Sequence, residues 1–260
     1  MKYTVALDIG ATKIAGGLID EKAKIHHFLK ISTQAKKSNK IILNNVFLII
    51  QKLIYTVGNA HARSLRSINL SIAGQIDHKK GMIIKSPNFN KNFKNIKIKK
   101  ILANKFHMPI YIDNDVNCFT LGEAVYGLGK GYNTVVGMTL GSGVGGGMVI
   151  NKKIYHGKNN LAGEFGQMMI NNVVWEKKKE NIKKAEYLAQ ALANVLHILD
   201  PDIIIIGGGI SNIPQLVAKA RQKLHKTLYY QALKQTKIVK SRLQTQANLL
   251  GAYLLNTIYG

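Results

Sequence analysis

Residue types that can move a proton and surround a phosphate lie close together in segment 112–167. An acidic cluster, Asp113-Asn114-Asp115, follows the apolar run 109–112, and Gly163-Glu164 comes near the end of the segment. Between them, residues 141–147 read GSGVGGG. A carboxylate can take a proton from a hydroxyl, and bare backbone N–H groups can surround a phosphate chain. The segment therefore predicts a site for phosphoryl transfer, with Gly141, Ser142 and Gly143 as its phosphate loop.

A second candidate phosphate loop lies near the N-terminus. Asp8 ends the apolar strand expected over 3–8, and the tight turn that begins at Gly10 leads into a strand over 14–19. We expect Gly10 to take a φ that other residues resist, and Thr12 and Lys13 to offer a hydroxyl and a positive charge to a phosphate. Asp8 is placed to hold a metal through water. An ordinary hairpin turn explains the same residues equally well, and the chain contains no GxxxxGK[ST] motif.

A third glycine motif follows the wholly apolar run 203–206. Gly207, Gly208 and Gly209 come directly after this run, and a helix is expected from about residue 213. An apolar run of this kind predicts a strand buried on both faces. Glycine-rich backbone between such a strand and a helix N-terminus is typical of a nucleotide site.

The elements that must position these residues alternate between strands and helices. Apolar residues at helical spacing predict a long helix over 41–57. Helices are also expected over 116–126, over 175–199 with a break near its lysine-rich start, and over 247–258. Shorter elements are expected as strands over 24–32, 68–73, 81–85, 109–112, 135–140, 148–150 and 237–239 and a helix over 96–106, with a turn at 74–77. The result is an α/β chain in two similar halves. No linker rich in Pro or Ser separates them, so the boundary is expected close to Asp113.

The net charge is strongly positive. Lys and Arg number 37 and Asp and Glu 13, which gives +24 at pH 7. A polyanionic partner is one explanation of such a balance. However, nearly all of the positive charge is lysine spread along the chain, whereas arginine is the better reader of bases and phosphates. A compositional bias is the preferred explanation, and nucleic acid is not expected as a partner.

Cysteine content and hydropathy exclude two further classes of protein. The single cysteine, Cys118, rules out a disulfide framework and a cysteine-based zinc cluster within this chain. No apolar run approaches the ~20 residues of a membrane span, and the first residues do not resemble a signal peptide. We therefore expect a cytoplasmic protein with no membrane partner.

Seven motifs taken together resemble the ROK family, the sugar kinases and related repressors of the hexokinase/actin-like superfamily. They read DIGATKI, SIAGQID, SPNF, IDNDVN, LGSGVGGG, AGEFG and IIIIGGGIS, in the family's order. The resemblance implies a two-domain actin-like ATPase (ribonuclease H-like) fold with a cleft between the domains. The domains would be 1–113 with 247–260, and 114–246. It also implies a homodimer and a hexose substrate.

The resemblance assigns roles to individual residues. Asp115 matches the catalytic base that takes the proton from a sugar primary hydroxyl, and Asn88, Asn114 and Glu164 match sugar-binding positions. Asp8, Gly10, Thr12 and Lys13 match the first phosphate motif, Gly141 to Gly143 the second, and Gly207 to Gly209 the adenosine motif. ATP and Mg²⁺ are the cofactors implied. Asp115 also stands where a helix N-cap is expected, and the two roles are compatible.

The chain departs from the family pattern after Gly166. Gln167 stands where the family has a His that bonds both metal and sugar, and the cysteine-rich zinc motif is missing. We therefore expect no structural zinc, one sugar-binding carboxylate fewer, and a less crowded sugar pocket.

Three alternatives to an ATP-dependent, glucokinase-like hexose kinase stay open. The same fold could use polyphosphate as its phosphoryl donor, which the missing zinc motif and the basic charge favour, whereas AGEFG and NDVN resemble the ATP-dependent branch more closely. It could be an inactive relative of the kinases, or a sugar-binding regulator. The related repressors carry a helix-turn-helix before the first strand, and here that strand is expected from Tyr3. The sequence does not name the sugar.

Overall fold

The computed structural model describes residues 2–57 and 64–260. The chain packs into two compact α/β units, unit 1 (Met1–Gly122 with Thr245–Gly260) and unit 2 (Glu123–Gln244). One boundary lies within helix α3 (Asp115–Tyr126), later in the chain than the expected division after Asp113. The other lies at the start of helix α7 (Thr245–Tyr259).

Unit 1 is built on a mixed sheet of order β3-β2-β1-β4-β8. Its strands are β1 (Tyr3–Ile9), β2 (Lys13–Asp20), β3 (Ile25–Ser32), β4 (Leu65–Ile72) and β8 (Ile110–Asn114). β1, β4 and β8 are parallel, and their register pairs Asp8 with Ser71 and Ser71 with Asp113. The carboxyl ends of these three strands therefore meet at one edge of the sheet, which carries both acidic motifs of unit 1.

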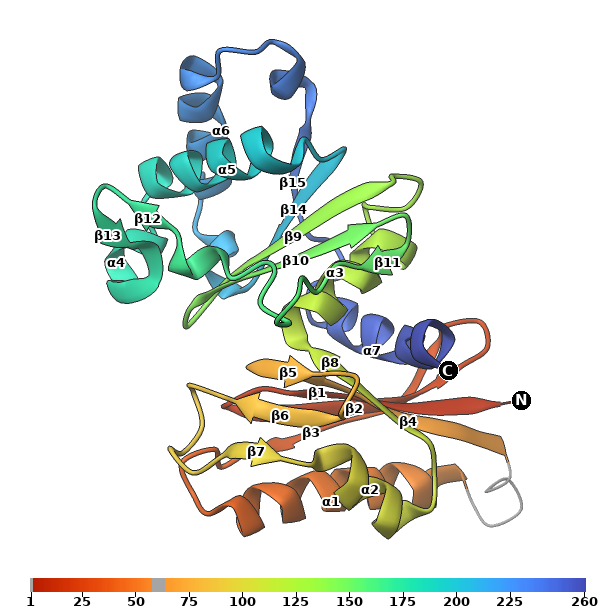
Figure 1. Cartoon of the computed structure of the whole chain (residues 1–260). Helices are drawn as coiled ribbons and strands as arrows, with labels where there is room; N and C mark the ends of the chain where they lie inside the picture. The colour runs from red at the N-terminus through yellow and green to blue at the C-terminus, as the bar shows by residue number, and fades with distance from the viewer. Residues whose placement is uncertain (1, 58–63) are drawn as a thin grey trace. The chain divides into compact units, whose positions relative to one another are not determined.

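Helices cover both faces of this sheet (Figure 1). α1 (Asn39–Val57) and α2 (Ile98–Phe106) lie on one face and α7 on the other. The apolar spacing of α1 places Ile42, Val46 and Ile49 in the core, as the sequence predicts. A small sheet of β5 (Gln75–Asp77), β6 (Met82–Lys85) and β7 (Lys94–Ile96) lies beside the main sheet; β5 takes the place of an expected turn, and β7 was not predicted.

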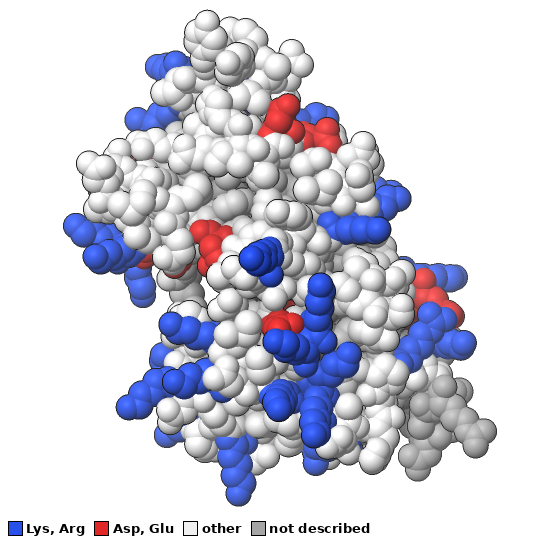
Figure 2. All heavy atoms as spheres, in the orientation of Figure 1, with Lys and Arg blue, Asp and Glu red and all other residues white. Residues whose placement is uncertain are grey.

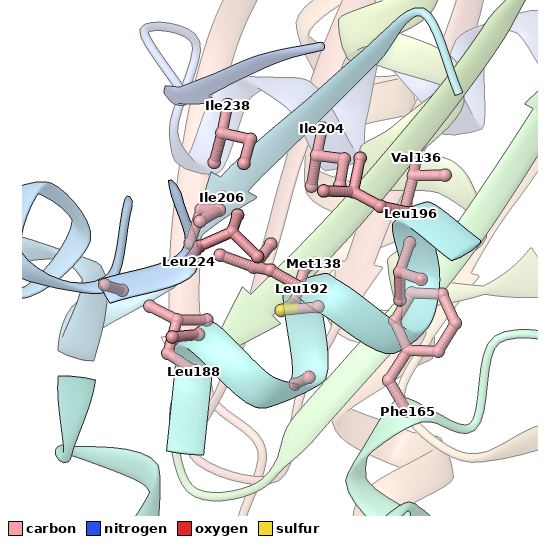
Figure 3. Packing of buried hydrophobic residues seen from close by; sticks show 14 of the residues in the cluster. Val136, Met138, Phe165, Leu188, Leu192, Leu196, Ile204, Ile206, Leu224 and Ile238 are labelled. Atoms are coloured by element: carbon pink, nitrogen blue, oxygen red, sulfur yellow. The ribbon is translucent and has the colours of Figure 1, made fainter. Parts of the chain in front are cut away.

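Unit 2 has a second five-stranded sheet, of order β11-β10-β9-β14-β15. Its strands are β9 (Thr134–Leu140), β10 (Val144–Ile150), β11 (Lys153–Ile154), β14 (Ile203–Gly207) and β15 (Lys237–Lys240). Helices α5 (Ala185–Leu199) and α6 (Leu216–Thr227) bury apolar faces against it. Figure 3 shows Leu188, Leu192 and Leu196 of α5 directed toward side chains of the sheet such as Met138 and Ile204. β12 (Met169–Ile170) and β13 (Val173–Val174) form a separate hairpin.

The local structure of unit 2 differs from the sequence-based expectation at two places and agrees with it at a third. The glycine loop is only Gly141–Gly143, because residues 145–147 already belong to β10. The helix expected over 175–199 is broken, as predicted, into a 3₁₀ turn (Trp175–Lys177), α4 (Lys179–Ile182) and α5. The helix expected from about residue 213 begins at Leu216, because a 3₁₀ turn (Gly209–Asn212) comes first.

The surface is rich in basic side chains. Figure 2 shows Lys and Arg distributed over the visible face, with few acidic groups among them. In residues 22–112 of the sequence the only acidic residue is Asp77. Among the described residues, no helix is both long enough and apolar enough to cross a membrane.

Candidate active site

The carboxylate of Asp8 lies at the carboxyl end of β1 among polar neighbours from other elements. Ser71 of β4 donates a hydrogen bond of 3.0 Å to its Oδ1, and Asn248 of α7 donates one of 3.3 Å to the same atom. Burial raises the pKa of Asp8 to about 6, and the two hydrogen bonds and the charge of Lys13 oppose this rise. A bound cation would stabilise the ionised form of this desolvated carboxylate, which has Lys13 as a positive neighbour.

The turn Gly10–Lys13 is a tight hairpin connection with the backbone bond Gly10 N–H to Lys13 O at 3.0 Å. Thr33, directly after β3, holds the turn in place. Its hydroxyl donates to Gly10 O at 2.6 Å, and its N–H donates to Thr12 O at 3.2 Å. The expectation of an unusual φ at Gly10 is wrong, since Gly10 is not among the residues with positive φ. A Cβ there would meet only Lys13 O at 3.5 Å, so local packing does not require the glycine. The space beside it is available to a ligand.

Asn114, and not Asp115, caps helix α3. Its Oδ1 accepts hydrogen bonds from the N–H groups of Val116 at 2.8 Å and Asn117 at 3.2 Å, the geometry of an N-cap. Its Nδ2 donates to Gly74 O at 2.8 Å. Asp115 is the first residue of the helix and is half-buried. The capping role expected for Asp115 therefore belongs to its neighbour, and Asn114 keeps only one amide hydrogen for a ligand.

Asp113 supports the two residues that follow it. This buried carboxylate accepts the N–H of Asn114 at 2.6 Å and Nδ2 of Asn117 at 2.9 Å, and Tyr259 near the end of α7 donates its hydroxyl to the other oxygen. Burial, followed by the negative charge of Asp113, raises the pKa of Tyr259, so its hydroxyl remains a donor. The backbone that carries Asp115 is thus held by a network reaching into the last helix.

Asn88 lies in an exposed turn that is linked to Asn114 through the backbone. The turn closes with Phe89 N–H bonded to Ser86 O at 3.0 Å, and the Ser86 hydroxyl donates to Ala73 O at 2.7 Å. Ala73 precedes Gly74, whose carbonyl accepts the amide of Asn114. The structure therefore brings this turn to the edge of unit 1 where Asp8 and Asp115 lie.

In unit 2 the two glycine motifs lie against each other. Gly208 has φ +84, and a Cβ there would overlap the backbone of Leu140, the residue just before Gly141. Parallel pairing of β14 with β9 continues to Gly207 opposite Thr139. Gly141 and Gly209 differ from Gly208, because a Cβ at either would meet no atom within 4 Å. Bare backbone beside open space is the arrangement that a phosphate chain requires.

Glu176 lies next to the loop Gly141–Gly143, in a cluster that the sequence did not predict. Glu176 accepts Val144 N–H at 3.0 Å on Oε2 and the side-chain amide of Gln167 on Oε1. A Cβ at Gly143 would lie 2.8 Å from the same Oε2, and one at Gly166 would lie 2.5 Å from it. Partial burial raises the pKa of Glu164, and the charge of Glu176 raises it further. Glu176, bonded to the amide of Gln167, thus lies at the end of the glycine loop, and its charge acts on Glu164.

Glu176 is a further acidic side chain in this region, and the expected loss of one sugar-binding carboxylate stays a prediction. It lies in a 3₁₀ turn just before a lysine-rich stretch, where a surface helix was expected. Its position beside the glycine loop is evident only from its hydrogen bonds with Val144 and Gln167. The side chain of Gln167 is held in place by its hydrogen bond to the carboxylate of Glu176. Among the residues that the structure describes, no three His, Cys, Asp or Glu side chains are grouped as a metal site would need.

The candidate residues thus form two sets. Unit 1 holds Asp8, the 10–13 turn, Asn88, Asn114 and Asp115, while unit 2 holds the loop Gly141–Gly143, Glu164 and Gly207–Gly209. The model of the ROK family matches residues 4–183 and 176–257. The chain belongs to the ROK family. The family expectation drawn from the seven motifs is confirmed.

Curated relatives in the ROK family include enzymes and regulators. The chain is 30% identical to an uncharacterised protein of Clostridium perfringens, over 97% of each chain. It is 23% identical to a glucokinase of Thermotoga maritima over 95% of each chain. It is also 24% identical to the xylose repressor of Bacillus spizizenii, over 96% of this chain and 75% of the repressor.

Solved structures confirm the fold. The ROK glucokinase of Streptomyces griseus, solved in complex with glucose and AMPPNP, superposes with a TM-score of 0.78 at 22% identity. The match covers 98% of this chain and 99% of the glucokinase. The fold is therefore the two-domain actin-like ATPase fold that the resemblance implied.

Proposed function

We propose that this protein is an ATP-dependent sugar kinase that phosphorylates the primary hydroxyl of a hexose, glucose or a related sugar. One observation carries the proposal: Asp115 and Asp8 share one edge of the unit 1 sheet, each held there by hydrogen bonds from other elements. A proton acceptor on a held backbone, at the same sheet edge as a carboxylate that can hold a metal, is the constellation that phosphoryl transfer to a hydroxyl uses.

Asp115 takes the proton from the sugar hydroxyl. It stands at the first position of α3, and the N-cap bonds of Asn114 fix the backbone on which it is carried. Asn114 offers its remaining amide hydrogen to the sugar, and Asn88 a second amide. The carboxylates Glu164 and Glu176 suit a polyol, because ionised carboxylates accept hydrogen bonds from hydroxyl groups.

The residues present fit ATP and Mg²⁺. Gly141 and Gly209 leave open space beside bare backbone, and Asp8 is a desolvated carboxylate that a cation would stabilise. Asp8 would hold Mg²⁺, Gly10 to Lys13 and Gly141 to Gly143 the phosphates, and Gly207 to Gly209 the adenosine. When bound, Mg·ATP supplies the phosphoryl group and offsets its charge. The side chain of Lys13, whose charge acts on Asp8, adds positive charge at the same place.

The test is ADP release from Mg·ATP with a panel of hexoses and N-acetylhexosamines, with polyphosphate run in parallel by following sugar phosphate. Asp115→Asn should lower kcat by about 10²–10⁴-fold, because a general base contributes a factor of this size. Sugar binding, measured by calorimetry, should persist. Asp200→Asn, an exposed position at the end of α5, is the matched control and should retain wild-type turnover.

Each other outcome has a definite meaning. Turnover with polyphosphate but not ATP would replace the donor and keep the reaction. Sugar binding by a folded protein without turnover on either donor would overturn the kinase proposal and favour a regulator, a class to which the similar xylose repressor belongs.

A further inference from the structure

Asn248 of α7 joins the two acidic motifs of unit 1. Its Nδ2 lies 3.1 Å from the carbonyl oxygen of Asp115, 3.3 Å from Oδ1 of Asp8 and 3.4 Å from Oγ of Ser71. One amide nitrogen therefore reaches three acceptors, from β1, from β4 and from the start of α3. No role assigned above explains this convergence.

The sheet alone does not fix the spacing of the two motifs. Asp8 pairs with Ser71 and Ser71 with Asp113, so the acidic motifs lie on strands two positions apart. Strands two positions apart are about 10 Å from each other, too far for direct hydrogen bonds between their side chains. Ser71, on the strand between them, donates to Asp8, and Asn248 of α7 reaches both Asp8 and the carbonyl of Asp115.

The position of Asn248 is itself rigid. Helices α3 and α7 approach so closely that a Cβ at Gly122 would overlap the carbonyl of Ala247, and a Cβ at Gly251 would overlap the carbonyl of Cys118. Asn248 lies between these two contact points on α7. The helix cannot slide along α3 without losing both contacts, so the amide stays at a fixed place relative to Asp115.

We propose that Asn248 is a positioning residue that fixes the backbone of Asp115 and the carboxylate of Asp8 at one mutual spacing. The inference rests on the proposed kinase function and adds a residue from the last helix to its site. The proton acceptor and the metal-side carboxylate must face the same hydroxyl and phosphoryl group. A displacement of about 1 Å between them is enough to cost two orders of magnitude in rate.

Asn256 provides a matched control in the same helix. It is also a half-buried asparagine, and its Oδ1 accepts a hydrogen bond of 3.2 Å from Asn69 of β4. It therefore joins α7 to the sheet as Asn248 does, yet it contacts no candidate site residue in the described hydrogen bonds. A loss of activity that results only from loosening α7 should appear in both variants.

The experiment compares Asn248→Ala, the isosteric Asn248→Asp and Asn256→Ala in the full-length protein. Wild-type turnover on the sugar panel is measured first, and melting by circular dichroism confirms that each variant folds. Both Asn248 variants should lower kcat by about 10- to 100-fold, with the KM of the sugar within about twofold of wild type. Asn256→Ala should keep the wild-type kcat even if its melting temperature falls.

The split between kcat and KM separates positioning from packing. Loss of positioning slows the chemical step and leaves sugar binding intact, so kcat falls while the KM of the sugar stays near wild type. A merely structural Asn248 would change kcat no more than Asn256 does.

Three results would count against these conclusions in distinguishable ways. A silent wild-type enzyme would overturn the proposed function, and the role of Asn248 with it. An active wild type whose Asn248→Ala and Asn256→Ala variants lose equal activity would overturn only the positioning role. An Asn248→Asp variant with wild-type kcat would do the same, because it would show that donation by the amide is not needed.

Discussion

At the scale of single residues, Asp8 lowers the stability of the fold at neutral pH. Its pKa is raised from 3.8 to about 6 by burial, so the native state binds this proton more tightly than the unfolded chain does. Below about pH 4 both states hold the proton and the residue has no pH-dependent effect. As the pH rises through about 6 the native carboxylate must ionise in a desolvated place, and stability falls.

Asp8→Asn should therefore stabilise the protein at neutral pH while abolishing turnover. The amide oxygen of Asn can still accept the bonds from Ser71 and Asn248. We expect a gain of about 1–3 kcal/mol near pH 8, since each pKa unit corresponds to 1.36 kcal/mol, and no gain near pH 4. Urea unfolding at both pH values measures this. An equal gain at the two pH values would mean that the charge of Asp8 is not the cause.

Glu176 should contribute to sugar binding more than to the chemical step. Glu176→Gln removes the charged acceptor of Val144 N–H and the like charge that raises the pKa of Glu164, so that pKa should fall. If Glu176 accepts a hydrogen bond from a sugar hydroxyl, loss of that charged bond costs about 1.5–3 kcal/mol, which predicts at least a tenfold rise in the KM of the sugar. Steady-state kinetics compare it with Glu180→Gln, an exposed glutamate in α4. Equal KM values in the two variants would contradict the assignment.

At the scale of elements, the glycines after β14 should separate folding from nucleotide binding. Gly208→Ala forces a side chain at positive φ into the backbone of Leu140 and should destabilise the protein by about 1–3 kcal/mol. Gly209→Ala meets open space, so it should leave the melting temperature unchanged and raise the KM of ATP. Thermal melts and ATP kinetics of both variants test this. A stable Gly208→Ala protein would show that the chain relaxes at this turn.

The long elements could be predicted because their residues are periodic or uniformly apolar. α1 is recognised by its periodicity and β14 by its uniformly apolar run, and both are found where expected. The short strands β7, β11, β12 and β13 have two or three residues each, too few for a pattern. Their pairing partners decide their conformation. The start of α6 was misplaced because a 3₁₀ turn stabilised by Ser211 intervenes.

The candidate site was predictable where its residues are contiguous in sequence. The motif Asp113-Asn114-Asp115 and the glycine loops can be recognised from residue type and order. Glu176 and Asn248 carry no such signal, since each becomes part of the site only through contacts with distant segments. The N-cap of α3 was predicted at Asp115 and is found at Asn114 for a similar reason. Both residues are good caps, and only the observed bonds decide between them.

At the scale of the whole molecule, the net charge of +24 should make stability depend on salt. Like charges repel in the compact state, and added salt screens this repulsion. Cross-strand Lys85 and Lys94 are directly opposed, which adds a local term of the same sign. Exposed ion pairs such as Arg66–Glu21 respond in the opposite direction but contribute little.

We expect the melting temperature to rise by about 2–6 °C between about 0.02 M and 0.3 M NaCl, because one kcal/mol corresponds to about 2–4 °C for a chain of this size. Differential scanning calorimetry measures the shift. An isosmolar concentration of sucrose is the control for effects other than screening. A melting temperature that falls with salt would mean that favourable ion pairs outweigh the repulsion.

The end of α7 determines where an affinity tag can be fused. Tyr259 bonds Asp113, and Gly260 follows it directly, so a peptide added after Gly260 would begin at the network that holds Asp115 in place. Lys2 lies before β1, and Asp8 lies near the strand's other end, roughly 20 Å away at about 3.3 Å per residue. Purification through an N-terminal fusion therefore keeps the added peptide away from the residues whose kinetics are to be measured.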